Sequence, residues 1–543
     1  MRPFFWLSFA LNVFSSAYAY ATPSRTIQKR AASNFISTQG DKFVVNGSDF
    51  SFIGTNAYWL PFLDSDDDIS KVLANISASG IKVVRTWAFN DVTEIPDDGS
   101  SWLQLICNGK TEVNTGPNGL PKLDKFVQLA QDHGIYVLFS LTNNWNPIAN
   151  ATNPAPLARN FLSNSYGGMD AYVRAFGTNQ LHDEFYTSDD IINFFQNYTQ
   201  QVVSRFVDNP FVFGWELAND PRCGSTVANS DTCTTTTITK WHATVSEFIR
   251  SIDPNHLVAS GNHGFQCPTC TKLFPITPTP TPSAAPGKRA PAGVTTPDRL
   301  MRDIAQRRKA RAAAASRPQK KKREGPTIRG RWAAPASGSN AKRQTSSTGP
   351  SFDGSQGVDS QDILNIPDIG FGTFQFFPDQ NVYTTDGETV PGSQGQSSFD
   401  FNNTVQEGIE WIQNQAAFAN AVGKPLALTA FGLVTQDNFP FFVPFNSSVP
   451  LVNQTSLSRR TDSQGTASTS SQQQSAYLTW LEAGITAGVQ GLTQYQFSAG
   501  GLTQGTSGTD SQGTSPNDGY STQGTATVET LQQAAQEQQG TSS

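Results

Sequence analysis

Short apolar runs alternate along this chain with longer segments in which apolar residues recur every three or four positions. The short runs are typical of buried strands, and the longer segments are typical of amphipathic helices. Eight such runs, separated by helical segments, predict a parallel sheet and therefore an α/β fold of the (β/α)8 TIM barrel type. The expected strands are residues 50–59, 81–89, 135–145, 211–219, 256–262, 369–377, 425–432 and 489–497, and clear helical patterns cover residues 68–80, 123–134, 191–206 and 405–423.

A doubly wound open sheet is the alternative arrangement of such units. That fold binds nucleotide phosphates at a glycine-rich turn that follows a strand. No such turn follows any of the eight runs. The closed barrel is therefore favoured, and a chain of 543 residues is long enough for a barrel with insertions.

Residues 275–350 interrupt the alternation with a segment rich in Pro, Ala, Ser and Arg. Between Lys288 and Arg343 this segment holds 17 Lys and Arg residues against 3 Asp and Glu, within a chain whose formal net charge is −6. Such a composition cannot bury a core, so we predict a disordered basic insertion. Because the flanking segments continue one fold, an insertion or an unspliced intron is favoured over an arm that binds nucleic acid.

The expected organisation is thus one barrel in two parts, residues 35–274 and 351–543. Near the C-terminus, Ser/Thr-Gln-Gly-Thr sequences recur at irregular intervals and carry no apolar positions that could stack. We expect these Ser/Thr/Gln/Gly-rich segments to form solvated loops rather than a solenoid.

The N-terminal sequence predicts secretion. Met1 and Arg2 precede the apolar run FFWLSFALNVF, and two Ala-x-Ala cleavage motifs follow it, which is typical of a signal peptide over residues 1–21. The run is short for a membrane-spanning helix, so a membrane anchor is the weaker alternative. Lys29 and Arg30 resemble a dibasic processing site, which makes residues 22–34 a candidate propeptide.

The cysteines fit an oxidising compartment. Cys223 with Cys233 and Cys267 with Cys270 are placed for two local disulfides, which leaves Cys107 unpaired. The single Cys-x-x-Cys lacks the second pair of a zinc ribbon, so we expect no metal and no cofactor. Asn-x-Ser/Thr sequons suit an extracellular glycoprotein, and they begin at Asn46, Asn75, Asn150, Asn197, Asn402, Asn446 and Asn453.

Polar residues gather where the expected strands end. In a barrel of this type the loops after the carboxyl ends of the strands build the active site. The residues at these positions are Arg85, Asn219, Asp220, Gln375, Thr429, Ala430 and Tyr495. Trp87 and Trp145 also follow strand ends, where they either line a sugar cleft or belong to the core.

Six sequences, in chain order, resemble the fungal endo-β-1,4-mannanases of glycoside hydrolase family 5. They are GTNAYWL, VRTWAFND, YVLFSLTNNW, YGGMDAYVRAFG, WELANDPRC and GKPLALTAFG, and the resemblance runs from about residue 35 to the last helix, outside the insertions. It implies a retaining mechanism with two glutamates. One follows an Asn at the end of the fourth strand and acts as acid and base. The other precedes an aromatic residue and Gly at the end of the seventh strand and attacks the anomeric carbon.

This chain departs from the family pattern at both catalytic positions. Asp220 occupies the acid/base position and is one methylene shorter than glutamate. Ala430 occupies the nucleophile position, with Thr429 before it, so that position holds no carboxylate.

Further departures surround the same positions. Gln375 and Phe377 stand where the family carries His and Tyr, and Tyr495 stands where it carries Trp. Arg85 and Asn219 match the pattern. The substrate-binding residues that the resemblance implies are Arg85, Trp87, Trp145, Asn219, Gln375, Phe377 and Tyr495.

These departures predict a secreted protein with a β-mannan-type cleft and impaired or absent catalysis. A positioned acid contributes roughly 10²- to 10⁴-fold, and loss of the nucleophile removes the two-step route. The alternative is an active retaining endo-β-1,4-mannanase that uses Asp220 and a second, unidentified carboxylate. The expected partner is β-mannan or a related β-1,4-linked polysaccharide, with no nucleic acid and no membrane, and the expected state is a monomer.

Two charged residues of the barrel need partners if they are buried. With the nucleophile carboxylate absent, we expect Arg85 to contact Asp220, water or bound sugar, because a buried unpaired charge is costly. Glu216 precedes the strand end, so strand alternation favours a hydrogen-bonded carboxylate of the barrel interior over a substitute acid.

Overall fold

The structure, a computed structural model, describes residues 34–107, 109–148, 159–276, 349–383, 401–448, 467–504, 513–522 and 526–541. The expected signal peptide lies outside the described residues. So do almost all of the candidate propeptide, residues 277–348 of the basic insertion, and the sequons that begin at Asn150 and Asn453.

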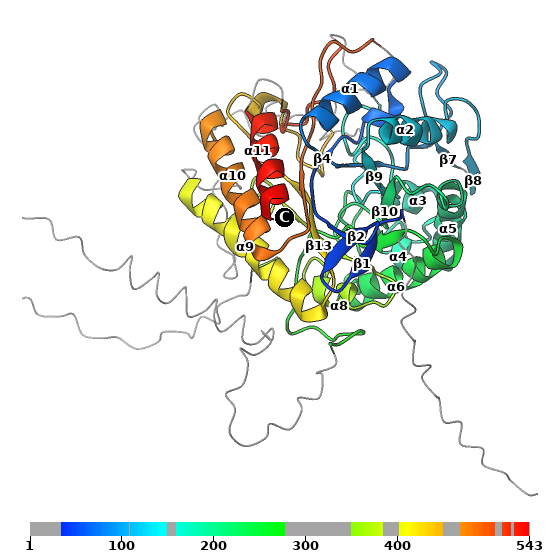
Figure 1. Ribbon diagram of the computed structural model, residues 1–543. Coiled ribbons are helices and arrows are strands. Elements are labelled where there is room, and N and C mark those ends of the chain that lie inside the picture. The colour runs from blue at the N-terminus through cyan, green and yellow to red at the C-terminus, as the bar shows by residue number, and fades with distance from the viewer. Residues whose placement is uncertain are drawn as a thin grey trace, which may run out of the picture.

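Eight parallel strands form one sheet in the order β11-β10-β9-β5-β4-β14-β13-β12. A parallel bridge between Ala259 and Phe371 joins its two end strands and closes the barrel (Figure 1). The predicted (β/α)8 TIM barrel is confirmed, and each strand lies within the range expected from the sequence. The strands are β4 (Phe52–Asn56), β5 (Val83–Trp87), β9 (Tyr136–Ser140), β10 (Val212–Glu216), β11 (Leu257–Ala259), β12 (Gly372–Phe376), β13 (Leu426–Phe431) and β14 (Gly491–Gln494).

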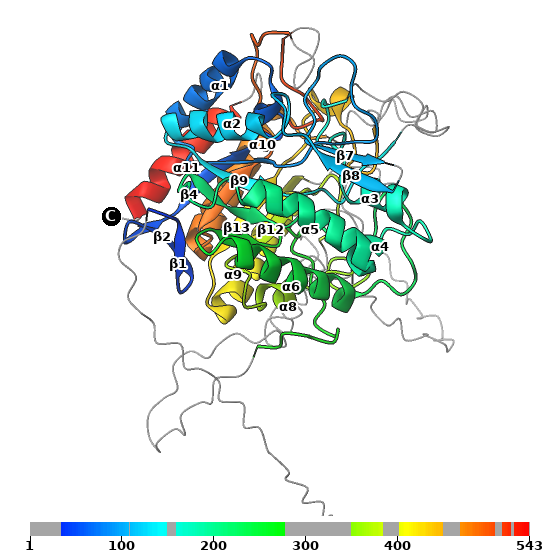
Figure 2. The ribbon, with the colours of Figure 1, turned by 90° about the vertical axis from the view of Figure 1, so that its right-hand side faces the viewer.

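Helices surround this barrel, with α9, α10 and α11 packed side by side over one part (Figure 1) and α5 and α6 over another (Figure 2). The four helical patterns of the sequence appear as α1, α2, α5 and α9. The helices are α1 (Asp66–Ala78), α2 (Pro121–Asp132), α3 (Met169–Phe176), α4 (Glu184–Thr187), α5 (Asp189–Val203), α6 (Thr235–Ile252), α8 (Ser360–Leu364), α9 (Phe401–Val422), α10 (Ser470–Ala487) and α11 (Thr527–Thr541), with short 3₁₀ turns η1 (Leu60–Phe62) and η2 (Phe439–Phe441).

Local sequence explains where helix α1 begins and which face it buries. The Ser65 side chain accepts a hydrogen bond of 3.2 Å from the backbone N–H of Asp68, which caps the first turn. Three Asp residues in that turn complement the positive end of the helix dipole. Ile69, Val72, Leu73 and Ile76, spaced three and four apart, are buried against the barrel.

An antiparallel sheet of three short strands closes the amino-terminal end of the barrel. Its strands are β1 (Ser37–Gln39), β2 (Lys42–Val45) and β3 (Ser48–Phe50). Phe43 of β2 packs edge-on against Phe213 and Phe371, with ring centroids 5.1 and 5.2 Å apart, and also contacts Phe52. Aromatic side chains thus fill this end of the barrel, and the polar strand ends lie at the opposite, carboxyl end.

The loops at the carboxyl end carry further structure. After β5, a second small sheet contains β6 (Asp91–Val92), β7 (Gln104–Cys107) and β8 (Lys110–Val113). Disulfides join Cys223 to Cys233 and Cys267 to Cys270, as the spacing indicates. Cys107 is a free, half-buried thiol. The disulfides stiffen the loops that follow β10 and β11, beside the strand ends that carry the polar residues.

Candidate active site

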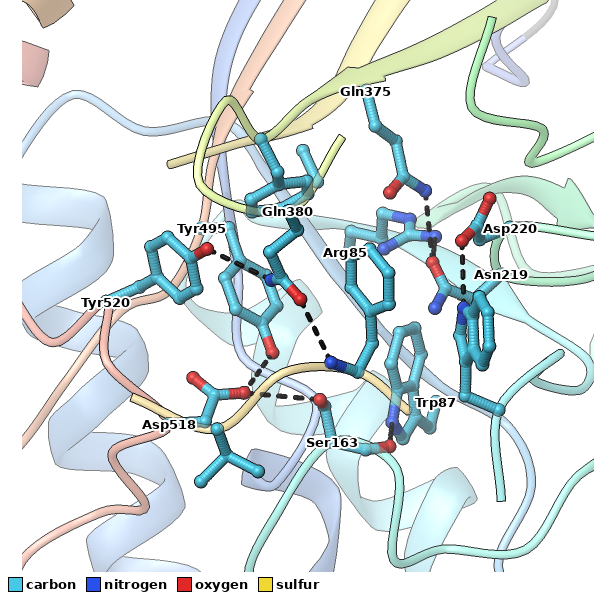
Figure 3. A pocket seen from close by; sticks show the side chains of 15 residues that line it. Arg85, Trp87, Ser163, Asn219, Asp220, Gln375, Gln380, Tyr495, Asp518 and Tyr520 are labelled. Atoms are coloured by element: carbon cyan, nitrogen blue, oxygen red, sulfur yellow. Dashed lines mark hydrogen bonds between the residues drawn. The ribbon is translucent and has the colours of Figure 1, made fainter. Parts of the chain in front are cut away.

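A cleft opens at the carboxyl end of the barrel (Figure 3). It encloses about 480 Å³, including space open to solvent, which falls within the range of about 300–1,000 Å³ typical of ligand sites. The side chains around it are Arg85, Trp87, Trp145, Ser163, Asn219, Asp220, Gln375, Phe377, Gln380, Ala430, Val443, Phe445, Tyr495, Asp518 and Tyr520. The structure thus brings together all nine of the catalytic and substrate-binding residues named from the sequence.

Both tryptophans whose place the sequence left open line this cleft. Trp87 is 1% exposed and Trp145 is 8% exposed, so each presents only part of its ring to the opening. The Trp87 Nε1–H donates to the Ser163 carbonyl at 3.0 Å, and the Trp145 ring stacks on Phe445 with centroids 5.1 Å apart. They belong to the core and to the cleft wall at once.

Arg85 does not pair with Asp220, contrary to the sequence-based expectation. Its guanidinium forms a two-point ion pair with Glu216, in which Nε lies 3.0 Å from Oε2 and NH2 donates to Oε1. The other NH2 contact, to Asn219 Oδ1, is 2.8 Å long, and NH1 lies 2.9 Å from Asn56 Oδ1. Arg85 is 1% exposed and Glu216 is fully buried. Glu216 is therefore the hydrogen-bonded carboxylate of the barrel interior that the sequence predicts. Arg85 pairs with Glu216 rather than Asp220 because its long side chain crosses the barrel interior from β5 to β10.

This ion pair holds Asn219 at the cleft. The Asn219 Oδ1 atom accepts from Arg85 and, at 3.0 Å, from Gln375 Nε2, while Asn219 Nδ2 donates to Asn143 Oδ1 at 2.8 Å. Three strand ends, those of β5, β10 and β12, are therefore connected through one amide. A ligand group that enters beside Asn219 would meet side chains already fixed in orientation.

Asp220 is held as a carboxylate. Arg222 donates from Nε to Oδ1 at 3.1 Å and from NH2 to Oδ2 at 2.5 Å, and Trp145 Nε1 donates to Oδ2 at 2.9 Å. His263 Nδ1 lies 3.4 Å from Oδ1. Burial alone raises the pKa of Asp220, but the charge of Arg222 and the contact with His263 outweigh it and lower the pKa to about 2. At pH 6 only about one such side chain in ten thousand carries a proton.

The Asp220 backbone is also constrained. Its φ of 56° lies in the left-handed region, and its N–H donates to the Gly261 carbonyl at 2.9 Å. Residues other than glycine adopt this conformation mainly when the surrounding structure imposes it. The backbone conformation of the loop after β10 therefore helps to direct the Asp220 side chain toward Arg222.

Ala430 presents only a methyl group at the end of β13. It is 1% exposed, lies in register with Gln375 of β12, and lines the cleft. The neighbouring Thr429 directs its hydroxyl to the Phe374 carbonyl, 3.3 Å away. Neither residue offers a group that can attack an anomeric carbon.

A second carboxyl group, which the sequence reasoning missed, lines the same cleft. Asp518 Oδ2 accepts a hydrogen bond of 2.6 Å from the Tyr495 hydroxyl and one of 3.2 Å from Ser163 Oγ. Burial raises the pKa of Asp518 to about 6 despite these hydrogen bonds. No periodicity marks Asp518, because it lies in an irregular Gly/Ser/Thr-rich segment after β14.

Other residues missed by sequence reasoning complete the walls. They lie in loops, where neither apolar spacing nor a strand end signals their position, and they are Ser163, Gln380, Val443, Phe445 and Tyr520. Arg222 and His263, which sequence reasoning also missed, contact Asp220 without lining the cleft. Gln380 Nε2 donates to the Tyr520 hydroxyl at 3.0 Å, and its Oε1 accepts from the backbone N–H of Phe445 at 2.9 Å. Gln380 thereby joins two loops of the cleft rim.

Asp379, which precedes Gln380, is a half-buried carboxyl that does not line the cleft. Burial raises its pKa to about 7, although the backbone N–H of Val434 donates to Oδ2 at 3.0 Å. Its folded pKa lies above the unfolded value of about 3.9, so stability is lost as pH rises from about 4 through 7. We expect Asp379→Asn to raise the free energy of unfolding by on the order of 2 kcal/mol at pH 8 and to leave it nearly unchanged at pH 4.5. Urea unfolding of both proteins at the two pH values checks this, and an equal effect at both would contradict it.

Within the described part of the chain, no group of three or more His, Cys, Asp or Glu side chains is arranged to hold a metal ion. None of the described helices is long and apolar enough to cross a membrane.

The cleft combines two carboxyl groups, aromatic walls and amide groups at the carboxyl end of a (β/α)8 barrel, where enzymes of this fold place their active sites. Residues 44–301 match the model of the cellulase family, glycosyl hydrolase family 5. The match covers just under half of the chain, and this part of the chain resembles that family.

Curated relatives of this chain include fungal mannan endo-1,4-beta-mannosidases. Mannan endo-1,4-beta-mannosidase F of Aspergillus fumigatus is 40% identical over 250 residues, which are 45% of this chain and 51% of that protein. Mannan endo-1,4-beta-mannosidase A of Aspergillus aculeatus is 37% identical over 255 residues, which are 47% of this chain and 61% of that protein. The aligned region thus spans between about half and three fifths of these two relatives.

Solved structures of mannanases share the fold. The endo-1,4-beta-mannanase from Rhizomucor miehei aligns with a TM-score of 0.58 at 23% identity, covering 93% of this chain and 99% of that one. The endo-beta-1,4-mannanase from Thermotoga petrophila aligns with a TM-score of 0.56 at 21% identity, covering 91% of this chain and 78% of that one. At these identities the likeness shows the barrel fold and carries no statement about activity.

Proposed function

We propose that this protein is a secreted glycoside-hydrolase-fold protein that binds β-mannan or a related β-1,4-linked polysaccharide and has impaired or absent catalysis. The observation that carries the proposal is the pairing of Asp220 with Arg222 in a cleft where Ala430 occupies the end of β13. Secretion and a monomeric state belong to the same proposal and rest on the sequence.

The chemistry of glycoside hydrolysis explains why this observation matters. A glycosidic oxygen leaves only when an acid protonates it, and a carboxylate with a pKa of about 2 is almost never protonated near neutral pH. A retaining mechanism also needs a nucleophile about 5–5.5 Å from the acid. The methyl group of Ala430 supplies none, so the family's two-step route has no first step here.

The walls of the cleft support the binding half of the proposal. The Tyr495 ring stacks on Tyr58 with centroids 6.2 Å apart and meets Phe377 edge-on at 5.5 Å. Aromatic faces next to amide and carboxyl groups suit a sugar, whose ring has apolar faces and polar edges. The names of the fungal relatives indicate mannan as the first ligand to test.

Assays on the purified protein test both the proposed binding and the proposed loss of catalysis. We expect a reducing-end assay on mannan to show turnover at least a hundredfold slower than about 1 s⁻¹, the lower end of usual enzyme rates. Isothermal titration calorimetry should show mannohexaose binding with a Kd between about 1 μM and 1 mM. No heat and no change in Tm at millimolar mannohexaose would contradict the proposed binding.

Removal of the Tyr495 ring should weaken this binding. We expect Tyr495→Ala to raise the Kd for mannohexaose roughly tenfold or more, because the ring forms part of the cleft wall. Tyr136→Ala is the matched control, since Tyr136 stacks on Phe211 at the start of its strand, away from the cleft. Calorimetry on both variants, with Tm measured alongside, checks the prediction, and equal losses in both would contradict a direct role for Tyr495.

A working endo-β-1,4-mannanase that uses Asp220 and a second carboxylate is the alternative function. The observation that favours it is Asp518, which places a second carboxyl group in the cleft. Mannan hydrolysis by the unmodified protein at about 1 s⁻¹ or faster, lost in both Asp220→Ala and Asp518→Ala, would establish this alternative in place of the first.

A further inference from the structure

Asp518 connects the two aromatic walls of the cleft. Its Oδ2 atom accepts from the Tyr495 hydroxyl at 2.6 Å and from Ser163 Oγ at 3.2 Å, and the Ser163 carbonyl accepts from Trp87 Nε1 at 3.0 Å. One carboxyl oxygen therefore ties a ring that follows β14 to a ring at the end of β5 (Figure 3). The strand order places β4 between β14 and β5, so the link crosses part of the barrel mouth.

The burial and the hydrogen bonds of Asp518 fit a residue that links the two cleft walls better than one that only packs in the core. Its side chain is 5% exposed and lines the cleft, and its Oδ1 atom is buried with no hydrogen-bond partner among the described residues. An unpaired buried carboxyl oxygen costs stability.

We propose that Asp518 is a positioning residue for sugar binding, which holds the Tyr495 ring, and through Ser163 the Trp87 ring, in the orientation that receives a β-1,4-linked mannosyl unit. This inference rests on the proposed binding function. The ligand class is a neutral pyranose chain, whose apolar ring face stacks on an aromatic platform of fixed orientation. Fixing a platform before binding improves affinity because less side-chain entropy is lost on association.

The ionisation of Asp518 gives the inference a distinctive signature. An ionised carboxylate is a stronger hydrogen-bond acceptor than its protonated form, so it holds the two hydroxyls more firmly. Burial raises the pKa of Asp518 to about 6, so we expect affinity to fall as pH decreases through this value.

The groups that face Asp518 do not titrate in the same range. Burial raises the pKa values of Tyr58, Tyr495 and Tyr520 above their ordinary value, and Ser163 does not ionise. Arg85, which acts on Tyr495, keeps its charge as arginine side chains do in proteins. Asp379, whose charge acts on Tyr520, titrates near pH 7, so it requires a separate control.

The test compares mannohexaose binding at pH 5 and pH 7.5 by calorimetry. We expect the unmodified protein to bind about threefold to tenfold more weakly at pH 5. Asp518→Asn keeps an acceptor for Tyr495 and Ser163 but cannot ionise, so its affinity should equal the pH 5 value at both pH values. Asp518→Ala should bind more than tenfold more weakly at pH 7.5. The matched control is Asp379→Asn, which removes another carboxyl with a raised pKa and should keep the pH dependence.

A measurement without sugar separates this inference from the proposed function. 3-Fluorotyrosine at position 495 should give a ¹⁹F signal that titrates with a midpoint near pH 6 in the otherwise unmodified protein and does not titrate in Asp518→Asn. Sugar binding without this titration, or with the same pH dependence in Asp518→Asn, would overturn the role of Asp518 alone. Titration without any sugar binding would overturn the binding function, and this inference with it.

Discussion

Replacing Ala430 and Asp220 together by glutamate is expected to produce mannan hydrolysis far above the sum of the two single changes. Ala430→Glu supplies a carboxylate at the end of β13, and Asp220→Glu extends the acid by one methylene toward the glycosidic oxygen. The two groups of a retaining mechanism act as one unit, and such units are strongly non-additive. We expect a gain of at least about 10³-fold in the double variant and less than about 10-fold in either single variant.

A reducing-end assay on mannan measures this result, and the double variant Ala430→Gln with Asp220→Glu is the matched control. Glutamine has nearly the size of glutamate but cannot attack an anomeric carbon, so this control should stay inactive. We expect the absolute rate to remain low, because the resemblance implies other side chains at the positions of Gln375, Phe377 and Tyr495. Equal activity of Ala430→Glu alone and the double variant would refute the cooperative reading, since it would show that Asp220 already serves as the acid.

The barrel could be predicted because its strands are buried on both faces. Parallel strands covered by helices are nearly continuous apolar runs, which stand out in the sequence. The two small sheets gave no such signal. Strand β1 has the sequence STQ and β8 the sequence KTEV, both largely exposed, so their pairing depends on the neighbouring barrel rather than on their own composition.

The candidate site could be predicted only where residues lie at strand ends. A closed barrel fixes where each strand ends. Asp220, Gln375 and Ala430 therefore lie around one cleft regardless of the conformation of the loops. The loop residues Arg222 and Asp518 decide the charge states of the cleft, yet nothing in their spacing indicates where the loops fold back. Glu216 is not among the expected partners of Arg85 for a related reason, because sequence order does not reveal which interior side chain a long guanidinium reaches.

Loss of the Glu216 carboxylate is expected to destabilise the protein by about 3–5 kcal/mol, because Arg85 would remain charged and buried without its partner. Arg85 and Glu216 are 1% and 0% exposed, so solvent screens the charge of the guanidinium only weakly. We therefore expect a lower midpoint of urea unfolding at pH 7 for Glu216→Ala. Asp124→Ala is the control, because it breaks the partly exposed pair with Arg205 and should cost only about 0–1 kcal/mol.

The double variant Arg85→Met with Glu216→Leu distinguishes an unpaired charge from a simple loss of packing. Replacing both charges with apolar side chains of similar size removes the desolvation cost of the pair, so we expect it to be more stable than Glu216→Ala. Sugar binding should nevertheless fall in the double variant, because Asn219 loses the Arg85 donor that orients its amide toward the cleft. A double variant less stable than Glu216→Ala would show that the ion pair itself, rather than the avoidance of a lone buried charge, stabilises the barrel interior.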